Sequence, residues 1–386
     1  MEPTTLPRKP TATEGTSSPK KTPSGPVTNG DAARVSASVS AAYIKRRKKL
    51  EMLKDNKHTS GKTKMDYKQA EAKVQMIDRK PKNAQVVTYS EMDTYRQCPL
   101  KHKWSYLDGW RSEAKVGGPL SRGSLWHDVM ESHYTLIREG AKGSLDDYRQ
   151  FMLQHFLTDE AGKQNVDQEL VEWMYDGHLE HWGLDDHWEP ILIEQAGEVR
   201  LRNEQGRATR FFLRFKIDLV VRDKATGLLW LVDHKSAATL SREVEIDLAE
   251  QFRLYAWALR QLGIPIHGMI RSDARTKRNK GPMKLEDRYR RVTTFMSEEE
   301  GDRIAQDFLR AAQSAYSKQI PVYASPDPST CSWKCDFLGV HLAARRGLAE
   351  PETLMKDFGK FKTEVKHREY EDGPVAVQIR QGRLGL

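Results

Sequence analysis

Three residues near the middle of the chain have the types and spacing of a chemically reactive site. Asp233 and Lys235 end an apolar stretch. Residues two apart in a strand point to the same side, so we expect their side chains on one face and His234 on the other. Asp218 lies in the preceding apolar run, and pairing of the two runs would bring its carboxylate beside that of Asp233. Two carboxylates suit a hard cation such as Mg²⁺, and an ammonium group can stabilise the charge on a phosphate.

The Asp-x-Lys spacing alone has an ordinary alternative, because strand edges often carry an Asp and a Lys as a solvated pair. Its surroundings favour chemistry here. Asp218 stands between Ile217 and Leu219, and a carboxylate buried in such a run is costly unless it is paired or holds a metal.

Apolar periodicity and turn residues predict the elements that position these side chains. We expect the folded part to begin near 86–89, with strands near 191–194, 198–201, 211–221, 228–233 and 266–272, and helices near 90–98, 123–138, 145–182 and 241–262. The short polar loop 222–227, with its late Gly227, predicts a hairpin that joins two of the strands. Ser90 has the residue type of a helix N-cap.

The positive charge of the chain is concentrated at its start. The 386 residues carry a formal net charge of +9, but residues 1–85 hold 19 Lys and Arg against 8 Asp and Glu, whereas the remainder holds 44 against 46. The first 40 residues are rich in Pro, Thr, Ser, Gly and Ala, so we expect 1–85 to be a disordered basic tail. It would be either a solvated tail or a weak tether to phosphate backbones.

Composition excludes several classes. A mean hydropathy of −0.72 and the lack of a long apolar run exclude a membrane span, and the first residues do not read as a secretory signal. Three cysteines are too few for a disulfide framework and indicate a reducing compartment. We therefore expect a soluble protein in the cytoplasm.

The ordered set of motifs resembles the PD-(D/E)XK nuclease superfamily, in particular its RecB-like branch, which includes the Cas-four type exonucleases and phage-encoded relatives. The motifs are Tyr89-Ser90 with Tyr95-Arg96-Gln97-Cys98-Pro99, Gly123-Ser124-Leu125-Trp126-His127, Ile217-Asp218, Val232-Asp233-His234-Lys235, Gln251-x3-Tyr255 and late cysteines. The resemblance implies an α/β fold with a restriction-endonuclease-like core, a mixed central sheet flanked by helices, over residues 86–345. A helical insertion about 140–188, a Cys/His cluster at 331–341 and an extension at 346–386 would complete the chain.

The resemblance also assigns roles to single residues. Mg²⁺ or Mn²⁺ would be held by His127, Asp218, Asp233 and the backbone carbonyl of His234, with Lys235 as the catalytic lysine. His127 has an alternative as an ordinary histidine on a helix flank.

Further matches to the branch are weaker. Gln251 and Tyr255, with Arg253 between them, would contact the nucleic acid, although the first two could be an ordinary helix pair. Glu194 loosely resembles an acidic residue that often precedes the hairpin, and Phe215 departs from the glycine common in the family.

The cysteines suggest a second metal site. Relatives in this branch often join the two ends of the domain with a four-iron cluster, and here Cys98, Cys331 and Cys335 would bind it with His341 in place of a fourth cysteine. Zinc and three unligated thiols are the alternatives.

By this resemblance the protein is a metal-dependent DNA exonuclease. Its substrate would be DNA that is single-stranded or has a free end, in replication, recombination or repair, with a helicase or recombination partner in a bacterial or phage-infected cell. Basic residues near the site, Arg253, Arg271, Arg275, Lys277 and Arg278, would follow the strand, or would form a solvated charged face. The alternative function is a non-catalytic DNA-binding or assembly module that keeps the fold.

Overall fold

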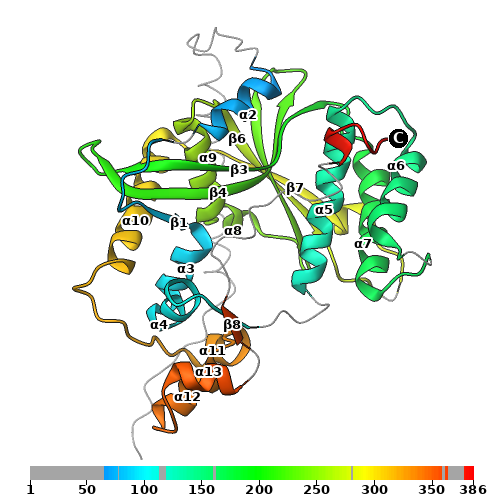
Figure 1. The fold of residues 1–386 in the computed structure, drawn as a ribbon. Coiled ribbons are helices and arrows are strands. Elements are labelled where there is room, and N and C mark those ends of the chain that lie inside the picture. The colour runs from blue at the N-terminus through cyan, green and yellow to red at the C-terminus, as the bar shows by residue number, and fades with distance from the viewer. Residues whose placement is uncertain are drawn as a thin grey trace, which may run out of the picture. The chain divides into compact units, whose positions relative to one another are not determined.

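A six-stranded mixed sheet forms the centre of the protein (Figure 1). The computed structural model describes residues 65–76, 78–112, 119–159, 162–279, 281–358, 361–363 and 378–386. Strands β3 and β4, β4 and β5, and β6 and β7 are antiparallel, whereas β1 with β4 and β5 with β6 are parallel. The strands are β1 (Gln85–Thr88), β3 (Trp188–Arg202), β4 (Ala208–Asp223), β5 (Leu229–Ala237), β6 (Ile266–Arg275) and β7 (Tyr289–Thr294). The expected α/β core with a mixed sheet is confirmed.

The length of β4 creates the place where the site forms. Along one edge of β4, β1 pairs with residues 211–214 and β5 pairs with residues 219–222. Residues 215–218 therefore lie between the segment of β4 that pairs with β1 and the segment that pairs with β5. Strand β3 runs along the opposite edge of β4. Asp218 sits at this junction. The expected strands at 191–194 and 198–201 are parts of the single strand β3.

Helices cover both faces of the sheet. One core joins Leu213 and Leu231 of the sheet to α2 (Tyr67–Gln75), α9 (Glu250–Gln261) and α10 (Glu298–Ala315). The other joins Val232 to α5 (Pro119–Arg138), α6 (Leu145–Met152) and α7 (Val166–Trp182), with the π-helix η2 (Leu153–Leu157) between the last two. The predicted helical insertion thus supplies α6, η2 and α7 of this layer, and α5 precedes it.

Two expected boundaries are wrong. The single helix at 241–262 is instead α8 (Glu243–Asp247) and α9, because Ala249 has a ψ of 84°, outside the helical range, which interrupts the helical backbone. The helix α3 (Tyr89–Gln97) is capped by Thr88, whose side chain accepts a hydrogen bond from the Glu91 amide, rather than by Ser90.

The basic tail ends earlier than expected. Helix α2 starts with a capping box at Asp66 and buries Ala70 and Val74 in the core beside β3. The sequence pattern does not predict this helix as part of the core, because it has no sustained apolar stripe. Residues 1–64 of the predicted tail lie outside the described part of the chain.

A small third core lies near the chain's end. It consists of Trp104, Phe337, Val340, Leu354 and Met355, and so joins an early segment to a late one. The elements around it are α4 (Pro99–His102), the π-helix η1 (Lys103–Leu107), β2 (Trp110–Ser112), α11 (Pro328–Lys334), α12 (Leu338–Arg345), α13 (Pro351–Asp357) and β8 (Phe361–Thr363). The 3-10 helix η3 (Leu285–Asp287) precedes β7. The boundary predicted at residue 345 therefore divides a shared core. None of the helices described is long and apolar enough to cross a membrane.

Candidate metal centre

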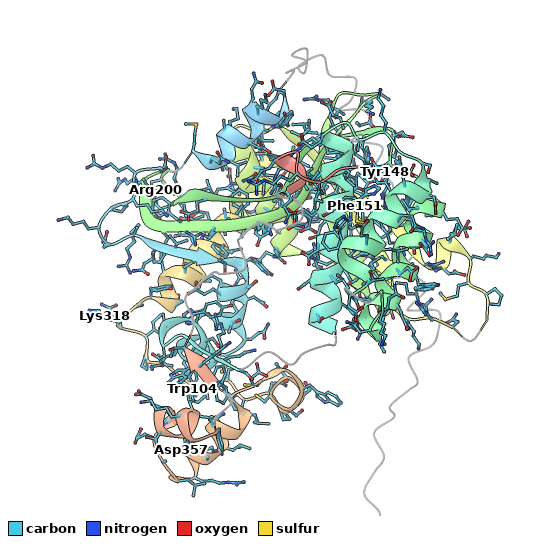
Figure 2. The ribbon with its side chains drawn as sticks, turned by 45° about the vertical axis from the view of Figure 1, so that its right-hand side comes forward. Trp104, Tyr148, Phe151, Arg200, Lys318 and Asp357 are labelled. Carbon is cyan, nitrogen blue, oxygen red and sulfur yellow. The ribbon has the colours of Figure 1, made fainter. Side chains whose placement is uncertain are left out.

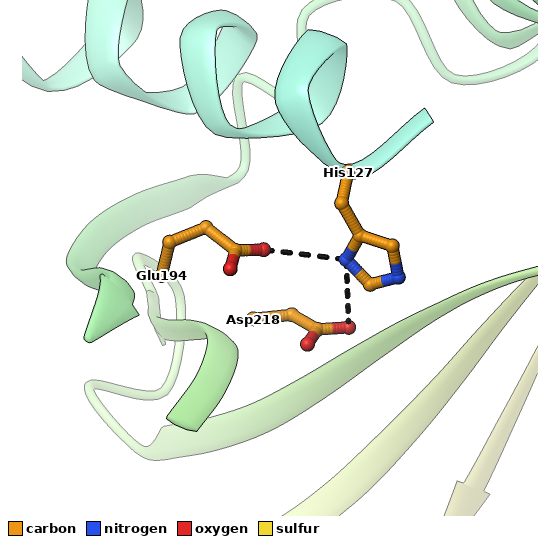
Figure 3. Close-up of side chains that lie close together, drawn as sticks. All are labelled: His127, Glu194 and Asp218. Carbon is orange, nitrogen blue, oxygen red and sulfur yellow. Dashed lines mark hydrogen bonds and ion pairs between the residues drawn. The ribbon is translucent and has the colours of Figure 1, made fainter. Parts of the chain in front are cut away.

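Three side chains from three different elements converge at the β4 junction (Figure 3). His127 comes from α5, Glu194 from β3 and Asp218 from β4. His127 Nδ1 lies 3.3 Å from Glu194 Oε1 and 3.6 Å from Asp218 Oδ2. The three ligand atoms all lie within 4.8 Å of one another, so two carboxylates and one imidazole could bind the same ion.

The backbone at Glu194 is part of this arrangement. Its neighbours pair regularly across the two strands, Ile193 with Leu219 and Gln195 with Ile217, so Glu194 stands opposite Asp218. Glu194 itself has a φ of 45°, in the left-handed region that is unfavourable for a residue with a side chain. Such strain is typical of functional sites. Of the sequence matches, that of Glu194 was the loosest, although the structure brings it closest to His127.

The carboxylates of the cluster set the protonation of His127, and Lys216 Nζ lies 3.1 Å from Glu194 Oε2. Burial raises the pKa of Asp218, and the nearby Asp233 and Glu194 raise it further, to about 6 despite His127. Burial lowers the pKa of His127, but the carboxylates of Asp218 and Glu194 outweigh burial and raise it to about 9. A proton on His127 therefore compensates part of the negative charge at neutral pH. A hard divalent cation could take over that role, so the donor set fits the metal that the resemblance implies.

Asp233 and Lys235 lie beside this cluster. One residue past the paired Leu219 and Val232, the antiparallel register sets Asp233 opposite Asp218. Lys235 Nζ donates to Asp233 Oδ1 at 2.9 Å, and Arg271 Nη1 lies 3.0 Å from Asp233 Oδ2. The expected convergence of the two aspartates and the lysine is present, but the Asp233 carboxylate faces two cations, and metal binding by Asp233 stays a prediction.

Lys235 is held in its charged form. Burial lowers its pKa, but the carboxylates of Asp233 and Asp218 more than compensate and raise the pKa above its usual value. The ammonium group is therefore available as a positive charge and not as a proton acceptor at neutral pH.

His234 points away from Lys235, as the strand period predicts. Its backbone amide donates to Asp218 Oδ2 at 2.7 Å, and its buried ring stacks on Tyr134 of α5 with centroids 5.6 Å apart. The backbone of His234 thus fixes the first carboxylate of the cluster. The role expected for its carbonyl stays a prediction.

Helix α9, which was expected to contact DNA, carries residues that differ in their surroundings. Gln251 Nε2 donates to Tyr255 Oη at 3.1 Å, so the predicted pair forms on one side of α9. Arg253 is 3% exposed, and its five N–H groups donate to Asp247, Thr294, Phe295 and Glu300. The prediction that Arg253 contacts DNA is wrong, because its guanidinium group is fully used inside the protein.

The other basic residues near the site also differ from one another. Arg271 is committed to Asp233 and to Asp273, whose Oδ1 accepts from its Nε at 2.9 Å. Arg278 donates to the Glu169 carbonyl and lies over the Trp173 ring. For Arg275 the described residues provide no carboxylate partner.

The cysteines meet at a separate place. Cys98, Cys331, Cys335 and His341 line one pocket of about 170 Å³ next to the third core. The only set of potential ligand atoms within 4.8 Å of one another among the described residues is the one at His127. The four groups are therefore gathered in one pocket, although no three of them have ligand atoms within 4.8 Å of one another.

Comparison with known proteins agrees with the class that this fold and site define. The sequence pattern of the PD-(D/E)XK nuclease superfamily matches residues 86–340, and the chain belongs to that superfamily. No curated protein matches the chain.

Two solved structures are weakly similar. One is the protein SSO0001, at 10% identity and a TM-score of 0.27, with 63% of this chain and 83% of that chain covered. The other is a provisionally named exonuclease from Eubacterium rectale, at 11% identity and a TM-score of 0.36, with 64% and 92% covered. Similarity this distant adds nothing to the assignment of the site.

Proposed function

We propose that this protein is a Mg²⁺- or Mn²⁺-dependent deoxyribonuclease whose metal is held by His127, Glu194 and Asp218. The observation that carries the proposal is the convergence of these three ligand groups beside the Asp233 and Lys235 pair. When bound there, the cation would supply Lewis-acid stabilisation of the phosphate and acidify a water molecule.

The side chains around the cluster would do the remaining work. Lys235 would stabilise negative charge that develops on the phosphate, because its raised pKa keeps it protonated. Asp233 orients the Lys235 ammonium group through the 2.9 Å hydrogen bond, and Arg271 orients Asp233 from its other oxygen. The His234 amide fixes Asp218. The site is thereby arranged before the substrate arrives, which reduces the reorganisation needed during the reaction.

The finer parts of the proposal rest on the motif resemblance. We propose an exonuclease of the RecB-like branch, probed best with DNA that is single-stranded or has a free end, and acting in replication, recombination or repair. A helicase or recombination partner, a phage origin and a cytoplasmic location belong to the same proposal. Gln251 would contact the DNA strand, and Tyr255, which is 7% exposed and packs in the core, would hold Gln251 in place through their hydrogen bond on α9.

The test is digestion of end-labelled linear DNA and of circular DNA with Mg²⁺ or Mn²⁺. Asp233→Ala should abolish cleavage, whereas Asp307→Ala, on the exposed side of α10, should not. Cleavage confined to linear DNA supports an exonuclease. Equal cleavage by wild type and Asp233→Ala would show that the site is wrongly assigned, and binding without any cleavage would favour the non-catalytic module.

A second proposal concerns the pocket of the cysteines. We infer that Cys98, Cys331, Cys335 and His341 hold a structural iron–sulfur cluster, supported by their common pocket and by the thiolate ligands that such clusters take. Visible absorbance and two-to-four iron atoms per chain would be expected after anaerobic purification, and Cys331→Ser should remove both. A colourless protein loaded with zinc would contradict the cluster.

A further inference from the structure

A row of cations on strand β4 leads away from the metal cluster. Residues at odd positions, Phe211, Leu213, Phe215 and Ile217, enter the core. The even positions between them carry Arg210, Phe212, Arg214 and Lys216, and the next even position is Asp218. Because successive side chains alternate between the two faces of a strand, the row and the metal ligand follow one another along β4.

Two further cations join the row from neighbouring segments. The Phe212 ring is 1% exposed, and it is covered by Lys80, whose Nζ lies 5.8 Å from the ring centroid, and by Arg200 of β3, whose guanidinium carbon lies 5.4 Å from it. We call this surface the basic strand face. It consists of Lys80, Arg200, Arg210, Arg214 and Lys216.

The carboxylates nearby leave part of this charge uncompensated. Glu198 is shared between Lys80 and Arg214, and Glu194 Oε2 lies 3.1 Å from Lys216 Nζ. Arg200 and Arg210 have no carboxylate partner within the described part of the chain. Arg200 donates to the Thr209 carbonyl at 2.7 Å, and Arg210 lies over the ring of Phe211. The surface is thus a positive strip that begins at the proposed site of hydrolysis.

The strip is open to a large partner. The helices α9 and α10 pack against the opposite face of β3 and β4, where the odd-numbered side chains are buried. The end of the β3–β4 hairpin projects from the rest of the sheet (Figure 1), and Arg200 lies near that projecting end (Figure 2). A rigid hairpin that carries a strip of cations fits a regular polyanion.

We propose that the basic strand face binds the phosphate backbone of the DNA that extends from the cleavage point, an inference that rests on the proposed nuclease function. The eight steps along β4 from Asp218 to Arg210 span at most about 27 Å at a rise of about 3.4 Å per residue. This length corresponds to about eight base pairs at about 3.4 Å each. Affinity should therefore increase with DNA length up to about that size and then level off.

The test is fluorescence anisotropy of labelled DNA in EDTA, where no cleavage can occur, with duplexes and single strands shorter and longer than about eight nucleotides. Arg200→Gln with Arg210→Gln should lower the slope of log affinity against log salt concentration by about 1.8 on duplex DNA. The expected change is about 0.9 for each of the two phosphates that the protein no longer neutralises. On single strands the change is about 0.7 for each phosphate. The matched control, Arg303→Gln with Arg346→Gln, removes two exposed charges elsewhere and should leave the slope unchanged.

If the salt-dependence slope changes with only one of the two forms of DNA, duplex or single-stranded, that form is the one that the basic strand face binds. Arg200→Glu should weaken binding further, which guards against an effect of altered packing over Phe212. An unchanged slope for both DNA forms, or an equal change in the control, overturns the proposal. If wild type cleaves DNA with metal but the double variant leaves the slope unchanged, only this inference is overturned. If the double variant changes the slope but wild type cleaves no DNA, only the nuclease function is overturned.

Discussion

Protons and metal ions should compete for His127. In the metal-free protein the pKa of His127 is raised to about 9 by Asp218 and Glu194 against the opposing effect of burial. A histidine must be neutral to bind a metal, so the metal has to displace this proton. The pKa of Asp218, about 6, leaves that carboxylate ionised above neutral pH. Between pH 7 and 9, His127 therefore controls the pH dependence of metal binding.

The size of the effect follows from the pKa. The affinity for Mg²⁺ should rise about tenfold between pH 7 and 8. By the pH at which the imidazole is fully neutral, it should have risen about 100-fold, which corresponds to about 2.7 kcal/mol of binding free energy. The sign for folding is opposite. A raised pKa stabilises the metal-free protein below the unfolded pKa of about 6.5, and that stability is lost as the pH rises through about 9.

Calorimetric titration with Mg²⁺ in two buffers of different ionisation enthalpy measures both the affinity and the protons released. Wild type should release about one proton at pH 7 and about half a proton at pH 9. His127→Gln should bind more weakly and without this pH dependence. Glu198→Gln is the matched control, because Glu198 lies on the same strand as Glu194 and pairs with Lys80 and Arg214 outside the cluster.

A pH-independent affinity in wild type would refute the reasoning, as would release of the same proton by His127→Gln. Loss of the pH dependence in Glu198→Gln would place the titrating group outside the cluster. Stability measured by urea unfolding with and without Mg²⁺ gives an independent check, since metal-induced stabilisation should grow over the same pH range.

Three further predictions concern stability and are measured by urea unfolding. Asp185→Ala should cost about 3–5 kcal/mol, because Arg291, which donates to both carboxylate oxygens, would be left as a buried unpaired charge; Asp185→Asn should cost less. Gly197→Ala should cost about 1–3 kcal/mol, since an added Cβ would lie 2.6 Å from Val74 Cγ1, and Val74→Ala in the same chain should recover part of the loss. Burial lowers the pKa of His133 to about 4, so on acidification the unfolded chain binds a proton at this histidine before the folded chain does. The free energy of unfolding should therefore fall by up to about 3.4 kcal/mol between about pH 6.5 and 4, and His133→Gln should remove this contribution.

The strands of the candidate site were predictable because their signals are local. Period two set Asp233 and Lys235 on one side and His234 on the other, and the 2.9 Å bond between Lys235 and Asp233 agrees with that reading. A short polar loop indicated the β4–β5 hairpin, whose register brings Asp218 opposite Asp233. The contact of His127 with Asp218 was anticipated from the motif order rather than from any local pattern.

Other features depended on contacts between distant segments. Helix α2 lies in what looked like a polar tail, and only its packing against β3 shows that Ala70 and Val74 are core residues. Arg253 looked like a surface cation, yet its five donors are used by groups 6 to 47 residues away. In both cases the sequence carries the residue type but not the partner.

The sequence by itself determined the chemical inventory of this protein: two aspartates, a lysine and a histidine in an order that resembles the PD-(D/E)XK nucleases. Only the tertiary structure decided which oxygens face His127. It brought in Glu194 through a left-handed backbone turn and directed Asp233 toward Lys235 and Arg271. The physical reason is that a ligand set is defined within a few ångströms in space, whereas residue order fixes only which side chains are available.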